Sequence, residues 1–231
     1  MNKYIFPALT LFAFLSFFAC GSVDPAKRYP LMVADQDPVF AGMIEAEFDR
    51  SFSARMDKKE IEVFFYPRYN AVVLEFRHEL VRYRQFWDPG NRRLFIQALD
   101  SYRADFAARN LVNTYFKTAA CYGKFTGAAE WETSSLSFTG HSSPRMELGY
   151  RFRNETPYFS VRQRAAPNER GHSDRGTSNS LQIIMYYTRA QAEELTKLFD
   201  QDYLMSLLAP VRNDPEPAKD EYREDADAVD F

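Results

Sequence analysis

The chain has 231 residues, a formal net charge of −3 and an aromatic content of 16%, with 21 Phe and 14 Tyr. The near-neutral charge gives no sign of a nucleic-acid partner, and we expect none. The aromatic content favours a β-rich core with large buried side chains.

The first 22 residues read MNKYIFPALTLFAFLSFFACGS. Lys3 precedes an apolar run of about 15 residues, which is shorter than the roughly 20 that a membrane-spanning helix needs. Ala19 and Cys20 follow the run, so a small residue stands at the expected cleavage point of a secretory signal. The stretch resembles a bacterial lipoprotein signal peptide that ends in FFAC, with Phe17 where the common pattern has Leu.

The resemblance implies removal of a signal peptide at 1–19 and lipidation of Cys20. Residues 20–36 then form a lipidated tether, and the protein is anchored to the inner or outer membrane of the cell envelope, stably if the cysteine is multiply acylated. A cleaved signal without lipid and an uncleaved membrane anchor remain alternatives.

Residues 37–212 are expected to form one α+β domain. Residues 213–231 hold eight acidic and two basic residues, and we interpret them as a disordered acidic tail. A helix is predicted after Asp37-Pro38, with Phe40, Met43, Ile44 and Phe48 as its apolar stripe.

Two further helices are predicted at 89–109 and 189–208. Asp88-Pro89 gives a cap for the first, and Thr188 with Gln191 forms a capping box for the second. Both should pack on one face of a single antiparallel sheet of about seven strands. The expected strands are 60–66, 70–80, 118–132, 134–140, 145–153, 157–164 and 180–187, the last five as a meander.

Strand 118–132 carries Gly123 and Gly127 among large residues. We expect Tyr102 and Phe106 of the preceding helix to pack over these glycines.

A strongly curved sheet with a helix across its mouth can enclose a pocket. The residues expected to line such a pocket are Tyr122, Phe125, Trp131 and Tyr150.

The sequence gives no catalytic, cofactor-binding or metal-binding residues. With Cys20 assigned to lipid, Cys121 has no disulfide partner and is expected to be buried as a small hydrophobic residue. His78 falls on an apolar strand face, where we expect a hydrogen-bonded residue at the edge of the core. The loop 165–179 is expected to be mobile.

Two functions follow. The first is a lipid-anchored, non-enzymatic binding or assembly module whose partner is another envelope protein. The alternative is a periplasmic carrier of a hydrophobic small molecule or lipid. An envelope hydrolase is a third and weaker interpretation, because no nucleophile and base can be named.

Overall fold

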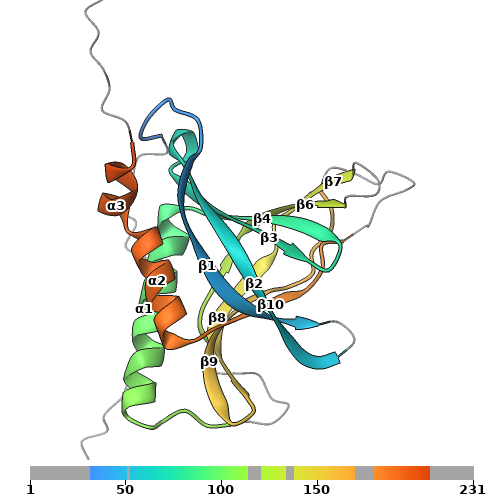
Figure 1. Cartoon of the computed structure of the whole chain (residues 1–231), viewed down its shortest axis with the longest axis vertical. Coiled ribbons are helices and arrows are strands. Elements are labelled where there is room, and N and C mark those ends of the chain that lie inside the picture. The colour runs from blue at the N-terminus through green and yellow to red at the C-terminus, as the bar shows by residue number, and fades with distance from the viewer. Residues whose placement is uncertain (1–31, 51–52, 114–120, 134–137, 170–178, 209–231) are drawn as a thin grey trace, which may run out of the picture.

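The structure, a computed structural model, describes residues 32–50, 53–113, 121–133, 138–169 and 179–208. Ten strands form one antiparallel sheet in the order β5-β8-β9-β10-β1-β2-β3-β4-β6-β7 (Figure 1). The strands are β1 (Val39–Arg50), β2 (Ser53–Tyr66), β3 (Ala71–His78), β4 (Val81–Trp87), β5 (Cys121–Thr126), β6 (Ala128–Thr133), β7 (Phe138–Ser142), β8 (Arg145–Arg153), β9 (Thr156–Gln163) and β10 (Ile183–Tyr187). The helices are α1 (Pro89–Ala107), α2 (Arg189–Phe199) and α3 (Gln201–Ser206), and Pro67–Tyr69 forms a 3₁₀ turn.

The sheet curls into a half-barrel. Strands β4 and β9 stand five places apart in the order, which in a flat sheet would separate them by about 24 Å. Nevertheless, the side-chain amide of Gln85 on β4 donates to that of Gln163 on β9 at 2.8 Å. Side chains from opposite halves of the sheet therefore meet on its concave side.

The expected α+β fold, a seven-stranded sheet with helices packed on one face, is wrong. The sheet has ten strands and dominates the molecule. Strand β4 was not expected, and the predicted strand 118–132 is two strands, β5 and β6, separated by Gly127. Because β5 pairs with β8 whereas β6 pairs with β4, the chain changes its place in the sheet at this glycine, and the expected meander does not form.

The helix expected after Asp37-Pro38 is also wrong, because these residues lead into β1. A β-bulge explains the misleading pattern. Gly42 has φ +155°, and the register with β2 shifts between Phe40 and Gly42. The shift leaves Phe40 and Met43 on one face and Ile44 on the other, which imitates helical spacing.

The other two helices begin where the sequence predicts. The Asp88 side chain accepts from the Asn91 amide at 2.7 Å to cap α1, and Thr188 forms the expected capping box with Gln191 on α2. The predicted second helix is divided at Asp200, whose carboxylate accepts from the Tyr203 amide and so caps α3. Within the described residues, no helix is long and apolar enough to cross a membrane.

Arg92 joins the helices to the sheet. Arginine is mostly a surface residue, but Arg92 is only 2% exposed. Its guanidinium donates to the Phe199 carbonyl at 3.1 Å, to Gln201 Oε1 at 2.8 Å and to Asn70 Oδ1 at 3.2 Å. These three bonds fix α1 against the start of β3 and the junction of α2 with α3.

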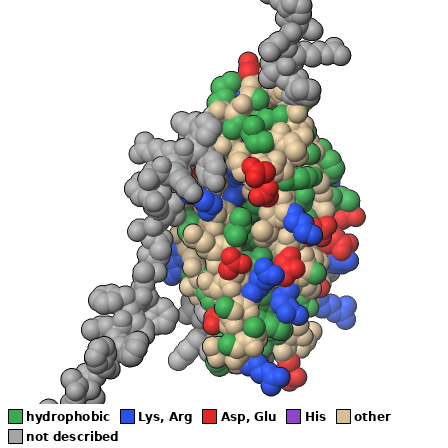
Figure 2. Space-filling view, turned by 90° about the vertical axis from the view of Figure 1, so that its left-hand side faces the viewer, with side chains coloured by type: hydrophobic (Ala, Val, Ile, Leu, Met, Phe, Trp, Pro, Cys, Tyr) green, Lys and Arg blue, Asp and Glu red, His purple; other side chains and the backbone are tan. Residues whose placement is uncertain are grey.

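The outer surface of the helices mixes acidic, basic and apolar side chains (Figure 2). Arg103 of α1 pairs with Glu193 of α2 at 3.1 Å, and both side chains are largely solvated. Such exposed pairs contribute little to stability, so this side of the molecule gives no particular sign of a binding site.

Candidate functional site

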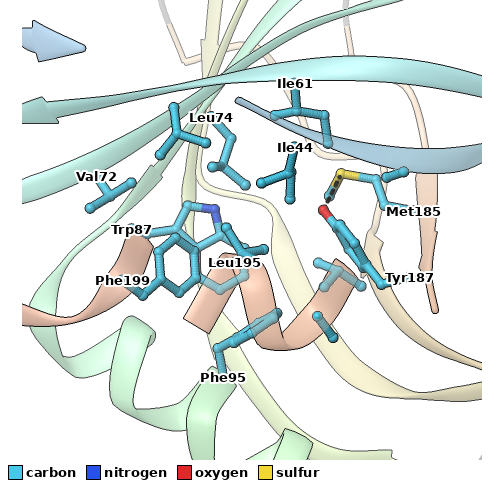
Figure 3. Packing of buried hydrophobic residues seen from close by; sticks show 14 of the residues in the cluster. Ile44, Ile61, Val72, Leu74, Trp87, Phe95, Met185, Tyr187, Leu195 and Phe199 are labelled. Carbon is cyan, nitrogen blue, oxygen red and sulfur yellow. Dashed lines mark hydrogen bonds between the residues drawn. The ribbon is translucent and has the colours of Figure 1, made fainter. Parts of the chain in front are cut away.

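The concave side of the sheet is occupied by the chain itself. Trp87 of β4, Phe95 of α1 and Phe199 at the end of α2 meet at its centre, with ring centroids 5.2 to 5.8 Å apart (Figure 3). All three are 2% exposed or less. Aromatic contacts at these distances are those of a packed core.

The four residues expected to line a ligand pocket do not form one group. Tyr122 of β5 and Tyr150 of β8 lie together, with ring centroids 5.9 Å apart. Phe125 packs against Trp87 at 5.2 Å, and Trp131 lies on β6, where it covers Gly140 of β7. The structure therefore brings two of the four side by side and gives the other two different neighbours.

The polar ends of the two tyrosines are used within the chain. The Tyr122 hydroxyl donates to Asp105 of α1 at 2.7 Å, and the Tyr150 hydroxyl accepts from the Val112 amide at 3.2 Å. Burial, followed by the adjacent Asp105 carboxylate, raises the pKa of Tyr122. These bonds attach α1 and the segment after it to the sheet.

The expected packing of Tyr102 and Phe106 over two glycines is wrong. A Cβ at Gly123 would meet Leu148, and one at Gly127 would meet Met146 and Phe125. Side chains of β5 and β8 thus take the space that was assigned to the helix. Tyr102 instead contacts Tyr150 and Phe159, and its hydroxyl donates to the Pro157 carbonyl at 2.9 Å.

Two residues with reactive side chains were considered in the sequence. Cys121 is exposed, so the expectation of a buried thiol is wrong. His78 is 3% exposed and stacks on Phe48 at 5.7 Å. Burial, with a smaller effect of Lys59, lowers the pKa of His78 and keeps its imidazole neutral. Its Nδ1 has no hydrogen-bond partner in the described part of the chain.

A group of His, Glu and Ser lies at the turn between β7 and β8. His141 Nδ1 is 3.2 Å from Glu169 Oε2, and the hydroxyl and backbone of Ser143 also bond to Glu169, which together with His141 lowers the pKa of that carboxyl. The Ser143 hydroxyl is thus bonded to the carboxylate of Glu169 and not to the imidazole of His141. A serine nucleophile needs the opposite arrangement, in which its hydroxyl is bonded to the histidine that acts as its base. Cys20 and the predicted signal peptide, most of the predicted loop 165–179 and the predicted acidic tail lie outside the described residues.

The convex face of the sheet carries a row of apolar side chains across four adjacent strands. The ladders pair Phe40 of β1 with Phe64 of β2, Phe64 with Val73 of β3, and Val73 with Phe86 of β4. All four point away from the core because their neighbours along each strand point into it. We call these four residues the aromatic row.

The aromatic row is partly open to solvent. Phe40 is 54% exposed and packs edge-on against Phe64 at 5.6 Å, whereas Val73 in the centre is fully buried. Met43, three residues after Phe40 on β1, is 48% exposed. A partly exposed apolar patch on a sheet face that is rich in aromatic side chains is typical of a protein-binding surface.

Charged side chains border the aromatic row. Glu75 follows Val73 by two positions on β3, and its carboxylate binds Arg82 at 2.5 Å and Arg84 at 2.8 Å. Tyr66 packs edge-on against Phe86 at 6.2 Å on the opposite border. Burial raises the pKa of Tyr66, and the nearby Arg84 partly opposes this. The surface thus combines aromatic rings with guanidinium groups, the residue types enriched at binding hot spots.

This surface was not predicted from the sequence, although part of it could be read there. In β2 the residues facing outward change from Glu60 and Glu62 to Phe64 and Tyr66. Such a change from charged to aromatic residues on the wet face of a strand is a usable signal. Phe40 could not be added to it, because the bulge at Gly42 hides the face of the strand to which Phe40 belongs.

Comparisons with known proteins identify a family whose description names no activity. Neither a search of curated proteins nor a search of solved structures found a match for the chain. A family model matches residues 41–206, a range that runs from the start of β1 to the end of α3. The chain therefore belongs to the family described as "Uncharacterised Treponema protein".

Proposed function

We propose that this protein is a lipid-anchored envelope protein whose folded part is a non-enzymatic binding module. It docks a protein partner through the aromatic row and the adjacent Met43. The observation that carries the proposal is the contrast between the two faces of the sheet. The concave face is covered by Phe95 and Phe199 of the helices, while the convex face leaves Phe40 and Met43 about half exposed.

The energetics favour a partner on the convex face. Full burial of one Phe or Met side chain stabilises by about 1.5–3 kcal/mol, so covering the exposed parts of Phe40 and Met43 offers on the order of 2 kcal/mol. The arginines beside the row can add hydrogen bonds at the rim of an interface. The alternative, a carrier of a hydrophobic ligand, needs space on the concave side, where the rings of Trp87, Phe95 and Phe199 are in contact.

The anchor is the second part of the proposal and rests on the FFAC junction at Cys20. Cells grown with a radioactive fatty acid should label the wild type, and Cys20→Ala should carry no label. A wild type without label, or a Cys20→Ala variant labelled as strongly as the wild type, would contradict the lipid anchor.

The docking surface is tested by photo-crosslinking in intact envelopes. A photoreactive amino acid is placed at Phe40 in one variant and at Met43 in another. A third variant carries it at Leu80, which is 85% exposed at the turn between β3 and β4 and serves as the control. Both surface positions should give the same crosslinked protein, identified by mass spectrometry, and Leu80 should not give it.

A competing change makes the test specific. Introducing Phe64→Ser into the Met43 crosslinking variant should abolish the product, because Phe64 supports Phe40 from the next strand. A product that is unchanged by Phe64→Ser, or that also forms from Leu80, would mean that the crosslink reports general exposure, and the proposed docking surface would be wrong.

A further inference from the structure

The other half of the convex face gathers arginines around a single carboxylate. Glu147 of β8 lies 3.8 Å from Arg145, 3.7 Å from Arg162 and 3.2 Å from Arg164. The side chains of Glu147 and Arg162 are only 15% and 18% exposed, so the centre of the group is shielded from water. A buried charge group of this kind is normally balanced in sign.

Here the positive charge exceeds the negative charge. Lys124 of β5 stands opposite Glu147 in the ladder, and Arg151 lies on the same face of β8. The pKa of Arg162 is lowered, first by burial and then by repulsion from Arg164 and Arg151. Five cationic side chains therefore share this face, and three of them, Arg145, Arg162 and Arg164, lie within 4 Å of the single carboxylate of Glu147. We call Lys124, Arg145, Arg151, Arg162 and Arg164 the basic cluster.

The basic cluster also has a hydrogen-bond donor to offer. Arg162 donates through one nitrogen to Gln182 at 2.8 Å, but its buried Nε has no acceptor within the described residues. A donor without an acceptor beside uncompensated positive charge is the environment that an anion stabilises.

We infer that the basic cluster binds a phosphate-bearing anion, either a soluble phosphate or the headgroup of an anionic phospholipid. The guanidinium fork matches phosphate oxygens in pairs, and a phosphate supplies the negative charge that Glu147 alone does not. This site lies on β5, β8 and β9, whereas the aromatic row lies on β1 to β4, so the inference stands independently of the proposed docking surface.

The test uses the full chain carrying Cys20→Ser, so that no lipid on the protein contributes. Sedimentation with vesicles of phosphatidylcholine is compared with sedimentation with equal parts of phosphatidylcholine and phosphatidylglycerol. Because the apolar N-terminus acts on both kinds of vesicle, the difference between them measures the charge-dependent part. In a second arm, the thermal midpoint is measured in inorganic phosphate and in chloride of equal ionic strength.

The cluster variant is Arg162→Gln with Arg164→Gln. Its matched control is Lys58→Gln with Arg77→Gln, which removes the same charge from the convex face of β2 and β3. Loss of two arginines from a membrane-contacting site should weaken binding to anionic vesicles on the order of 30-fold.

A preference for anionic vesicles that disappears only in the cluster variant assigns the headgroup as ligand. A midpoint raised by inorganic phosphate, and lost only in the cluster variant, assigns the soluble ion. No response in either arm, or an equal loss in the control variant, would overturn the inference.

Discussion

Replacing one phenylalanine on each face of the sheet tests the division between core and binding surface. Phe95 is fully buried and its ring meets those of Trp87, Phe159 and Phe199 at 5.2 to 5.8 Å. Phe95→Ala should therefore lower the free energy of unfolding by about 3–5 kcal/mol, because it removes a large side chain and leaves a cavity.

Phe40→Ala removes the same atoms from the convex face. This ring is 54% exposed and packs edge-on against Phe64. The expected loss is about 1 kcal/mol, the value of an aromatic pair with limited burial. Phe95→Leu, which leaves a smaller cavity, provides an intermediate value if Phe95→Ala does not fold.

Urea unfolding followed by near-ultraviolet circular dichroism measures both changes. With a slope of about 2.5 kcal/mol per molar urea, the midpoint should fall by about 1.5 M for Phe95→Ala and by about 0.4 M for Phe40→Ala. A loss below 1 M for Phe95→Ala would mean that the concave side is loosely filled, which would favour a carrier of a hydrophobic ligand over a binding module.

Three further changes test individual contacts. Gly140→Ala should destabilise by roughly 1–3 kcal/mol or more, because a Cβ at this position would overlap the ring of Trp131; an unchanged melting temperature would show that the ring can move aside. Gln85→Leu alone should destabilise by about 1–3 kcal/mol by leaving the buried Gln163 Oε1 without its donor, and adding Gln163→Leu should restore part of the loss; a double-mutant cycle that is strictly additive would contradict the bond across the half-barrel. In the folded protein the pKa of His78 lies below its ordinary value of 6.5, so below pH 6.5 the unfolded chain takes up the proton before the folded chain does, and the folded state loses stability as the pH falls. Urea midpoints measured from pH 8 to pH 5 should therefore fall less in His78→Gln than in the wild type, and parallel curves for the two proteins would refute this.

The sequence predicted those elements whose signals are local. The cap at Asp88 and the capping box at Thr188 mark the starts of α1 and α2, and both are present. The strand expected at 145–153 is present as β8 with the same bounds. These features depend on residues a few positions apart, so a single sequence is sufficient to find them.

The errors arise where one residue changes the period or where distant segments decide the outcome. Gly42 turns an alternating strand into an apparent helix. Gly127 divides one apparent strand into two that lie in different parts of the sheet. Arg92 is buried because Asn70 and Gln201, remote in sequence, supply its acceptors.

The candidate surfaces could not be predicted from local sequence patterns, because each combines segments that are distant in the sequence. The aromatic row combines four strands, and the basic cluster joins residues of β5, β8 and β9. The sequence does not show which strands lie side by side in either surface, because strand order in a curled sheet is set by closure of the sheet and not by proximity along the chain.

The native size of the protein extracted from envelopes in mild detergent tests the binding surface most directly. The wild type should run as a complex larger than one chain, and Phe40→Ser with Met43→Ser should run at the mass of a single chain while unfolding at nearly the same urea concentration. If the two proteins run at the same size, the convex face is not where this molecule meets a partner.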